Sequence, residues 1–151
     1  MRTNPLFLIF VLIPGMLWSQ TKPDAPKIKP PKMDTYLGVS SSGNLTVVQV
    51  LPLLDSTLNV YVEKKEKQVI AKAILIYRSK DFYEDESTGT IKTRFNSYSY
   101  TYQYNGTLPD NWKKFLKENL KTGDQLIIAD IHIKTKNGYL FTAPDLKINI
   151  Q

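Results

Sequence analysis

Residues 91–103 read IKTRFNSYSYTYQ, and side chains of two kinds alternate along the whole run. Successive side chains of a β-strand point to opposite faces, so this alternation predicts a strand. Residues 58–62 (LNVYV) alternate in the same way and predict a strand with one buried face. The runs 69–77 (VIAKAILIY) and 125–134 (QLIIADIHIK) are more continuously apolar. We therefore expect two further strands there, the first of them central and covered on both faces over most of its length.

Turn residues divide the rest of the chain into short segments. A strand is expected at residues 36–40. Another is expected at residues 45–51 (LTVVQVL), because this segment is rich in β-branched valine and ends at Pro52. The charged run 63–67 (EKKEK) is typical of a solvated hairpin turn rather than of a binding patch.

Asn137 and Gly138 mark a tight hairpin, because this pair favours positive φ. The segment that follows is expected to be a strand broken once, near Pro144 and Asp145. This spacing gives seven or eight strands. It predicts an all-β fold, an antiparallel β-sandwich, as a single domain of residues 34–151.

One segment has helical rather than strand periodicity. Four apolar residues recur at a spacing that places them on one face of a short α-helix, where they would cover a sheet. They are Trp112, Phe115, Leu116 and Leu120. Thr107 and Asp110 are expected to cap the start of this helix, and Gly123 is expected to end it in a left-handed conformation.

An apolar run, LFLIFVLIPGML at residues 6–17, follows Arg2 near the N-terminus. Twelve helical residues reach only about 18 Å, short of a hydrocarbon core of about 30 Å. The pattern is typical of a secretory signal peptide of residues 1–19, cleaved between Ser19 and Gln20. We therefore expect an exported protein, periplasmic or secreted, with no membrane span after cleavage; an uncleaved anchor is the alternative.

Residues 20–33 are expected to form a Pro/Lys-rich linker, since they hold four prolines, four lysines and one aspartate. Such a segment cannot bury a core and should be extended and solvated. The domain that follows holds 15 basic and 13 acidic residues, so it carries only +2 of the chain's net charge of +6. Nucleic-acid binding needs cations clustered on one surface. The charge distribution therefore argues against a nucleic-acid partner.

Residues 108–150 read LPDNWKKFLKENLKTGDQLIIADIHIKTKNGYLFTAPDLKINI. The succession is an amphipathic helix, then Gly123 and Asp124, an apolar strand, the turn at Asn137 and Gly138, and a last alternating strand. It resembles the C-terminal domain of the gliding-motility and type IX secretion protein GldM (PorM) of Bacteroidota. The resemblance implies an immunoglobulin-like sandwich and a module that binds other envelope proteins. The family's motor-coupling role depends on an inner-membrane helix and further periplasmic domains, and it is not carried over.

Tyr98, Tyr100, Tyr102 and Tyr104 alternate with small polar residues, so their rings share one face of one strand. If exposed, the row would contact a partner protein or stack on sugar rings, because tyrosine combines a large area with a polar tip. In the other interpretation the rings cover a sheet face or fill the sandwich. The opposite face holds serine and threonine, which would make a poor core, and this favours the core or half-core interpretation.

Little in the sequence indicates catalysis or a bound cofactor. There is no cysteine, and the one histidine, His132, is expected on the polar side of its strand. Acidic residues gather at 81–86 (DFYEDE), but their spacing does not match a calcium loop, so a solvated turn is expected rather than a metal site. The sequence therefore predicts a protein that is not an enzyme and holds no cofactor.

The leading hypothesis is an exported, non-catalytic β-sandwich that binds other envelope or secretion proteins, using a free sheet edge. The alternative is a small-ligand or glycan-binding domain that uses the strand at residues 98–104. A hydrolase with a pair of carboxylates is a third. The hypotheses differ in what the fold presents: a flat edge, a concave groove beside the tyrosines, or a cleft with two facing carboxylates.

Overall fold

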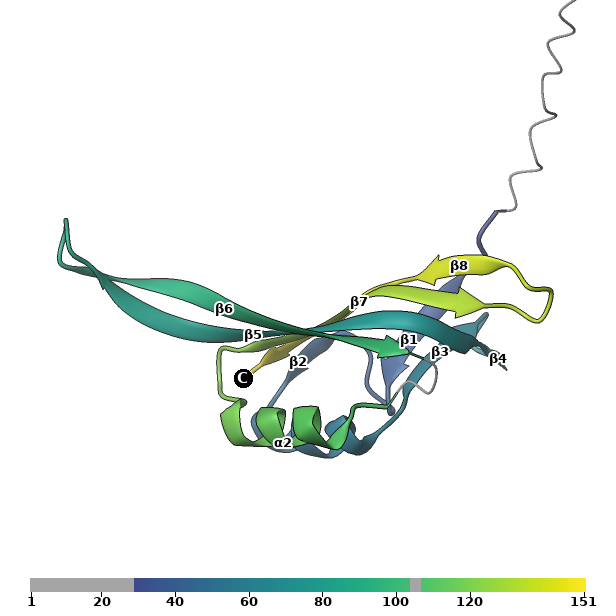
Figure 1. The fold of residues 1–151 in the computed structure, drawn as a ribbon, viewed down its shortest axis with the longest axis horizontal. Coiled ribbons are helices and arrows are strands. Elements are labelled where there is room, and N and C mark those ends of the chain that lie inside the picture. Colours follow the sequence, from purple (N-terminus) through teal and green to yellow (C-terminus); the bar gives the residue numbers. More distant parts are fainter. Residues whose placement is uncertain (1–28, 104–106) are drawn as a thin grey trace, which may run out of the picture.

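The computed structural model describes residues 29–103 and 107–151, without the side chains of residues 102 and 103. The expected signal peptide and most of the expected linker lie outside the described residues. Strands make up most of the described chain, and the helices are short (Figure 1). The strands are β1 (Met33–Leu37), β2 (Gly43–Leu45), β3 (Leu58–Val62), β4 (Glu66–Lys67), β5 (Val69–Asp85), β6 (Thr90–Gln103), β7 (Gln125–Lys134), β8 (Leu140–Ala143) and β9 (Leu146–Ile150). The helices are α1 (Val47–Val50), the 3₁₀ helix η1 (Leu51–Asp55) and α2 (Asp110–Asn119).

The strands form two sheets. The smaller has the order β1-β3-β4, and the larger has the order β2-β9-β7-β5-β6 with β8 paired to β7. The prediction of an all-β, sandwich-like fold is confirmed. One pair departs from the antiparallel expectation, because β2 runs parallel to β9. The described strands number nine rather than seven or eight, since β2 and β4 are too short to be recognised from periodicity.

A continuous core fills the space between the sheets. Leu58 and Val60 of β3 contribute from one side, and Leu75, Leu126 and Ile128 contribute from the larger sheet; all are at most 2% exposed. In β7 the buried residues alternate with partly exposed neighbours, whereas in β3 Asn59, between Leu58 and Val60, is also buried. Apolar burial of this kind is the main stabilising contribution of the fold.

A bulge in β7 changes which residues face the core. Leu126 and Ile128 are buried before it, whereas Ile131 and Ile133 are buried after it, so the alternation shifts by one residue. Asp130 lies at the shift, with φ of +51°, and the register with β5 is irregular in the same region. Such a bulge leaves one residue unpaired and increases the local twist.

Two predictions about strands are wrong. Residues 45–51 do not form one strand: only Leu45 belongs to a strand, as the end of β2, after which Thr46 and Gln49 form a capping box that starts α1, and Pro52 lies in the first turn of η1. This local helix start prevails over the β-propensity of the valines. In addition, β5 is central but is not covered on both faces, because Ile74 and Ile76 alternate with buried neighbours and remain partly exposed.

Helix α2 forms where periodicity predicted it, but its ends differ from the prediction. Its N-cap is Pro109, with no side-chain cap, so the expected cap by Thr107 and Asp110 is wrong. The helix ends at Leu120 in an extended conformation, three residues before Gly123. Gly123 does have positive φ, +93°, but it lies in the turn that leads into β7, and a Cβ there would lie 2.7 Å from Lys80 Cδ.

A buried carboxylate fixes this turn to β5. Asp124 is 1% exposed. Its Oδ2 accepts the hydroxyl proton of Tyr77 at 2.6 Å and the backbone N–H of Lys121 at 2.9 Å, while Oδ1 accepts the backbone N–H of Lys80 at 2.8 Å. Burial and the hydrogen bond to Asp124 raise the pKa of Tyr77, so its hydroxyl remains a donor.

Strands β5 and β6 continue beyond the body of the protein as a two-stranded arm (Figure 1). β5 pairs with β7 only as far as Arg78, opposite Gln125, whereas it pairs with β6 along its whole remaining length. We call residues 79–96 the arm. No helix of the described residues is long and apolar enough to cross a membrane.

We expect Asp124→Ala to lower the free energy of unfolding by about 3 kcal/mol, because the backbone N–H groups of Lys80 and Lys121 would lose their acceptor and the Tyr77 hydroxyl would keep only the carbonyl of Asn119. Urea denaturation followed by circular dichroism measures this. The matched control is Asp145→Ala, an exposed residue, which should change stability by less than about 0.5 kcal/mol. Equal effects of the two substitutions would contradict this role of Asp124.

Candidate interaction surface

The tyrosines predicted as a row lie on the last part of β6, and two of them are described in full. Tyr98 and Tyr100 point toward α2, on the same face as Tyr77 of the neighbouring strand. Tyr98 is 46% exposed and Tyr100 is half-buried. The side chain of Tyr102 and all of Tyr104 lie outside the described residues.

Five rings form what we call the aromatic cluster: Tyr77, Tyr98, Tyr100, Trp112 and Phe115. The Phe115 ring centroid lies 5.3 Å from Tyr98, 5.6 Å from Trp112 and 5.8 Å from Tyr77. The Trp112 centroid lies 5.8 Å from that of Tyr100. Tyr98 thus packs on Phe115 and remains 46% exposed, and Tyr100 is half-buried beside Trp112, which is the half-core arrangement.

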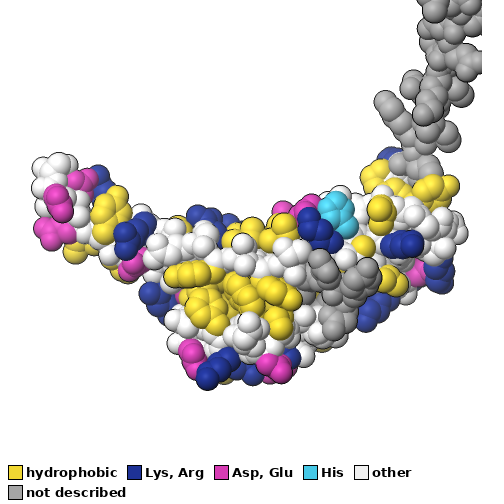
Figure 2. Space-filling model, viewed as in Figure 1, with side chains coloured by type: hydrophobic (Ala, Val, Ile, Leu, Met, Phe, Trp, Pro, Cys, Tyr) yellow, Lys and Arg dark blue, Asp and Glu magenta, His cyan; other side chains and the backbone are white. Residues whose placement is uncertain are grey.

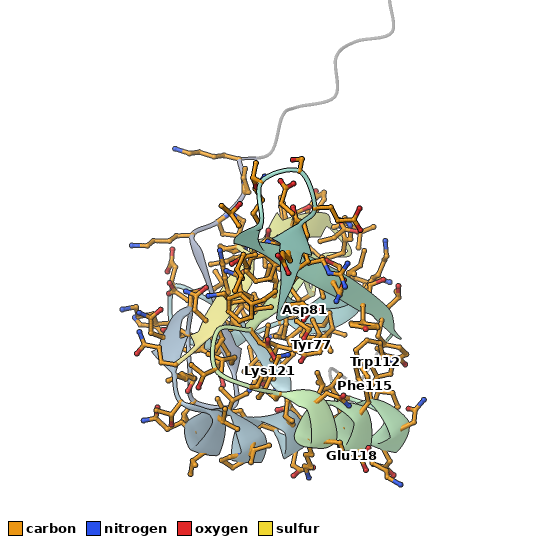
Figure 3. All side chains as sticks on the ribbon, turned by 90° about the vertical axis from the view of Figure 1, so that its left-hand side faces the viewer. Tyr77, Asp81, Trp112, Phe115, Glu118 and Lys121 are labelled. Atoms are coloured by element: carbon orange, nitrogen blue, oxygen red, sulfur yellow. The ribbon has the colours of Figure 1, made fainter. Side chains whose placement is uncertain are left out.

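The open side of the aromatic cluster is a shallow groove. It has a volume of about 270 Å³ and is lined by Tyr98, Asn111, Trp112 and Phe115. Hydrophobic side chains gather on this face of the molecule, above α2 (Figure 2). Trp112 and Phe115 lie between the helix and the sheet, whereas Glu118 points away from it (Figure 3).

The groove runs beside the free edge of the larger sheet. β6 is the last strand of that sheet, and no strand of the described chain pairs with its outer side. The backbone N–H of Lys80 points toward β7, where the side chain of Asp124 accepts it. The backbone carbonyl of Asp85 points to the opposite side of β5, where it accepts the N–H of Gly89. Backbone polar groups alternate in direction along a strand, so odd-numbered residues of β5 face β6.

The register then gives the direction of the β6 backbone. Odd-numbered β5 residues pair with even-numbered β6 residues, for example Tyr77 with Tyr98. The N–H and C=O groups of Ser97, Ser99 and Thr101 therefore point outward from the free edge. Natural edges are usually protected by charge, proline or bulges, and residues 95–101 contain neither charge nor proline.

Two of the four acidic residues at 81–86, Asp81 and Asp85, are paired with cations. Arg94 lies 3.2 Å from Asp81 and Lys92 bonds Asp85, and these contacts lower the pKa of both carboxyls. Among the described residues, no group of three or more His, Asp and Glu is placed to hold a metal ion.

His132 lies on the partly exposed face of β7, as expected. Its Nε2 is 2.8 Å from Asp130 Oδ1, and Lys72 Nζ is 2.9 Å from Asp130 Oδ2. Hydrogen bonding from Lys72, then His132, lowers the pKa of Asp130. The three residues hold the β7 bulge in place. They lie at the surface, and no cavity described in the structure reaches them.

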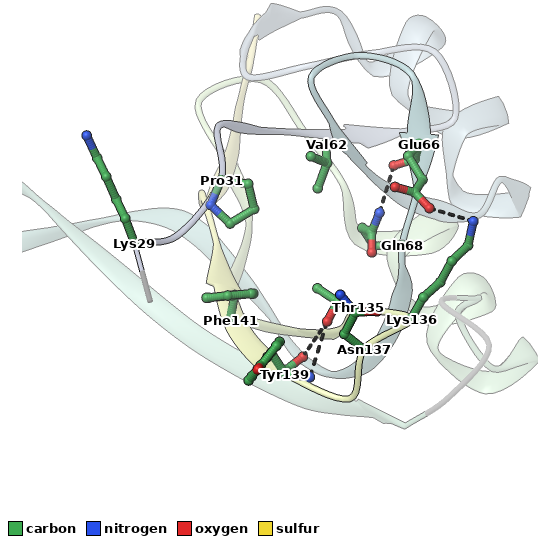
Figure 4. Close-up of a pocket in the computed structure, with 10 residues that line it drawn as sticks. All are labelled: Lys29, Pro31, Val62, Glu66, Gln68, Thr135, Lys136, Asn137, Tyr139 and Phe141. Carbon is green, nitrogen blue, oxygen red and sulfur yellow. Dashed lines mark hydrogen bonds and ion pairs between the residues drawn. The ribbon is translucent and has the colours of Figure 1, made fainter. Parts of the chain in front are cut away.

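A second cavity lies at the other end of the molecule, between the β3–β4 and β7–β8 hairpins (Figure 4). Its volume is about 390 Å³, and Tyr139, Phe141 and Gln68 are among the residues that line it. An ion pair of 2.6 Å between Lys136 and Glu66 joins the two hairpins beside it. Its walls are a mixture of polar and apolar groups without a convergent set of reactive side chains.

The remaining residues singled out from the sequence have structural positions. Asn137 and Gly138 lie in the β7–β8 hairpin, where Gly138 has φ of +82° and donates its N–H to Thr135 O at 2.9 Å. The predicted hairpin is therefore confirmed. Trp112 and Phe115 face the sheet from α2, as their spacing predicted.

No protein-family model matches this chain, and no curated protein is detectably similar to it in sequence. The resemblance of residues 108–150 to the GldM C-terminal domain therefore remains a sequence-based expectation.

We expect Phe115→Ala to lower the free energy of unfolding by about 2 kcal/mol, because this ring contacts three others and covers Tyr77. The same substitution at Phe82, which is 62% exposed on the arm, is the matched control and should change it by less than about 0.5 kcal/mol. Chemical denaturation measures both. A negligible effect at Phe115 would mean that the aromatic cluster does not contribute to the stability of the fold.

Proposed function

We propose that this chain is an exported, non-catalytic interaction module of the cell envelope that binds other envelope or secretion proteins. The observation that carries the proposal is the edge of β6, which is uncharged over residues 95–101, pairs with no other described strand on its outer side and lies beside the partly exposed aromatic cluster. An extended segment of a partner can add to this edge as a further strand.

The physical basis is the unpaired backbone. Along β6 the outward N–H and C=O groups at Ser97, Ser99 and Thr101 are each available for a ladder hydrogen bond to an added strand. Backbone bonds of this kind contribute affinity with little sequence preference. Specificity would come from side chains that enter the groove lined by Tyr98, Asn111, Trp112 and Phe115.

The cellular location is part of the same proposal. The N-terminal apolar run supports export to the periplasm or the exterior. The resemblance to the GldM C-terminal domain supports an immunoglobulin-like topology and a place among envelope proteins.

A second candidate function is the binding of a small ligand or glycan. The groove favours it, because aromatic rings beside an amide side chain, Asn111, offer both a stacking surface and hydrogen bonds. The groove is shallow, and the long free edge next to it offers far more hydrogen-bonding groups, so protein binding is the preferred function.

We expect Ser99→Pro to abolish capture of protein partners, because proline removes an outward N–H and leaves the bonds to β5 in place. Tagged wild-type and variant chains would be used to purify partners from envelope extracts, with mass spectrometry of the bound proteins. Ser99→Ala, which keeps the N–H, is the matched control and should retain the partners. Thermal unfolding confirms that both variants are folded.

Equal recovery of the same partners with Ser99→Pro and Ser99→Ala would exclude strand addition at this edge. No recovered protein, together with binding of a saccharide on a glycan array that Trp112→Ala removes, would favour the second candidate function.

A further inference from the structure

We propose that the strand which adds to β6 is β6 of a second copy of this chain, paired antiparallel about a two-fold axis at Ser97. This inference rests on the proposed function, because it names the partner of the same edge. Each arm would then lie along the body of the other copy.

The register follows from the axis. Residues 91–103 of the two copies pair, so nearly the whole of β6 is used. Directly opposite residues of an antiparallel pair lie on the same face. Asn96 of one copy therefore faces Tyr98 of the other, and Arg94 faces Tyr100, all on the side of the sheet that bears α2.

Two incomplete surfaces meet in this arrangement. The aromatic cluster is open on the side of the β6 edge, with Tyr98 46% exposed. The arm extends beyond the body (Figure 1), and on its α2 side Arg94 and Asn96 contact Asp81 of the same arm. In the pair, the guanidinium of Arg94 reaches the rings of Tyr100 and Trp112, whose centroids lie 5.8 Å apart. A cation over an aromatic face is a favourable contact.

The charges are complementary in this register. The contacts of Tyr98 with Phe115 and of Tyr100 with Trp112 show that α2 runs antiparallel to β6. Asp110, whose side chain is 99% exposed, therefore lies toward the end of β6. Lys92 of the second copy arrives opposite residue 102, above that end of the helix. Lys92 also bonds Asp85 of its own arm, and Asp110 lies 3.4 Å from Lys113, so this approach adds one contact between opposite charges to pairs that already exist within each copy.

The axis also keeps like charges apart. An axis at Thr93 would oppose Lys92 of one copy to Arg94 of the other, which is unfavourable. An axis at Ser97 places the uncharged residues 95–101 at the centre and the cations at the two ends. These charges favour a second copy over an unrelated strand as the occupant of the edge.

A single cysteine tests the register, because the chain contains none. With the axis at Ser97, the two Cα atoms of this residue lie about 5.5 Å apart. Ser97→Cys should therefore crosslink to itself with a short thiol–thiol reagent in dilute solution. Ser87→Cys, at the exposed tip of the arm and far from the axis, is the matched control and should not be crosslinked by the same reagent. Equal yields from the two variants would overturn the register.

A charge at the axis tests the pairing itself. Ser97→Glu places two carboxylates opposite each other in the pair, and it should raise the dimer dissociation constant about tenfold or more. In the single chain the same carboxylate faces Arg78, so the fold is preserved. Ser97→Gln, similar in shape but uncharged, should dimerise like the wild type. Light scattering after size exclusion, over a range of concentrations, measures the mass.

The outcomes separate this inference from the proposed function. A concentration-dependent dimer that Ser97→Glu and Ser99→Pro disrupt, and that Ser97→Gln and Ser99→Ala retain, supports both. A wild-type chain that is monomeric at high micromolar concentration would contradict the proposal that a second copy pairs with β6. If that monomer still loses an envelope partner through Ser99→Pro but not through Ser97→Glu, the proposed function stands. If the wild-type chain is monomeric and neither Ser99→Pro nor Ser97→Glu changes the recovery of partners, both the dimer and the proposed function are refuted.

Discussion

The buried carboxylate of Asp124 is the contact on which the rest of the structure depends. It accepts hydrogen bonds from β5, through Tyr77 and Lys80, and from the turn after α2, through Lys121. A carboxylate buried to this degree is favourable only when its oxygens are satisfied by donors. The burial of Asp124 is therefore favourable only when β5 and the turn after α2 are both in place. Its hydrogen bonds fix the positions of these two segments relative to each other.

Asp124 also determines where the sheet ends and the arm begins. The N–H of Lys80 points toward β7, where a sheet would offer it a strand carbonyl, but the Asp124 side chain accepts it instead. β7 starts at Gln125, opposite Arg78, and β5 continues with β6 alone. The same contact holds α2 beneath the Tyr77 ring, which sets the groove beside the β6 edge. One polar network thus places both halves of the candidate interaction surface.

The alternation in β3 follows from burial, since Leu58 and Val60 are buried and Tyr61 is only partly buried, whereas β7 was predicted from a nearly continuous apolar run. None of the described side chains of β6 is buried, and its alternation instead places Tyr98 and Tyr100 against the rings of α2. The length of β5 could not be read in this way. Beyond Tyr77 the strand is held by pairing with β6 rather than by a core, so Phe82 and Tyr83 are exposed and the apolar pattern stops. The prediction of a strand at residues 45–51 is wrong because the capping box of Thr46 and Gln49 starts a helix there, and this local interaction outweighs the β-propensity of the valines.

The candidate site was predicted in part. The tyrosine row was found from spacing, and its half-burial follows from the helix that also showed a clear stripe. The position of β6 at the sheet edge could not be predicted from the sequence, because strand order depends on long-range pairing and leaves no local sequence pattern. Asp124 gave only a weak signal as part of the Gly-Asp pair, since burial of this carboxylate depends on donors from β5 and from the turn after α2, which are far apart in the sequence.

The edges of this protein are unequal, and the difference bears on function. The other terminal strands of the two sheets are short: β2 has three residues, β4 has two and β1 has five. Short edges offer little to an incoming strand. β6 has fourteen residues and ends in an uncharged stretch, with hydroxyl side chains on one face and aromatic rings on the other. A protein that had only to avoid aggregation would shorten or charge such an edge, as it does elsewhere in this fold. Among the described strands, β6 is the long edge, no described strand pairs with its outer side, and the partly exposed aromatic cluster lies beside it. This combination supports the proposal that a further strand binds at this edge.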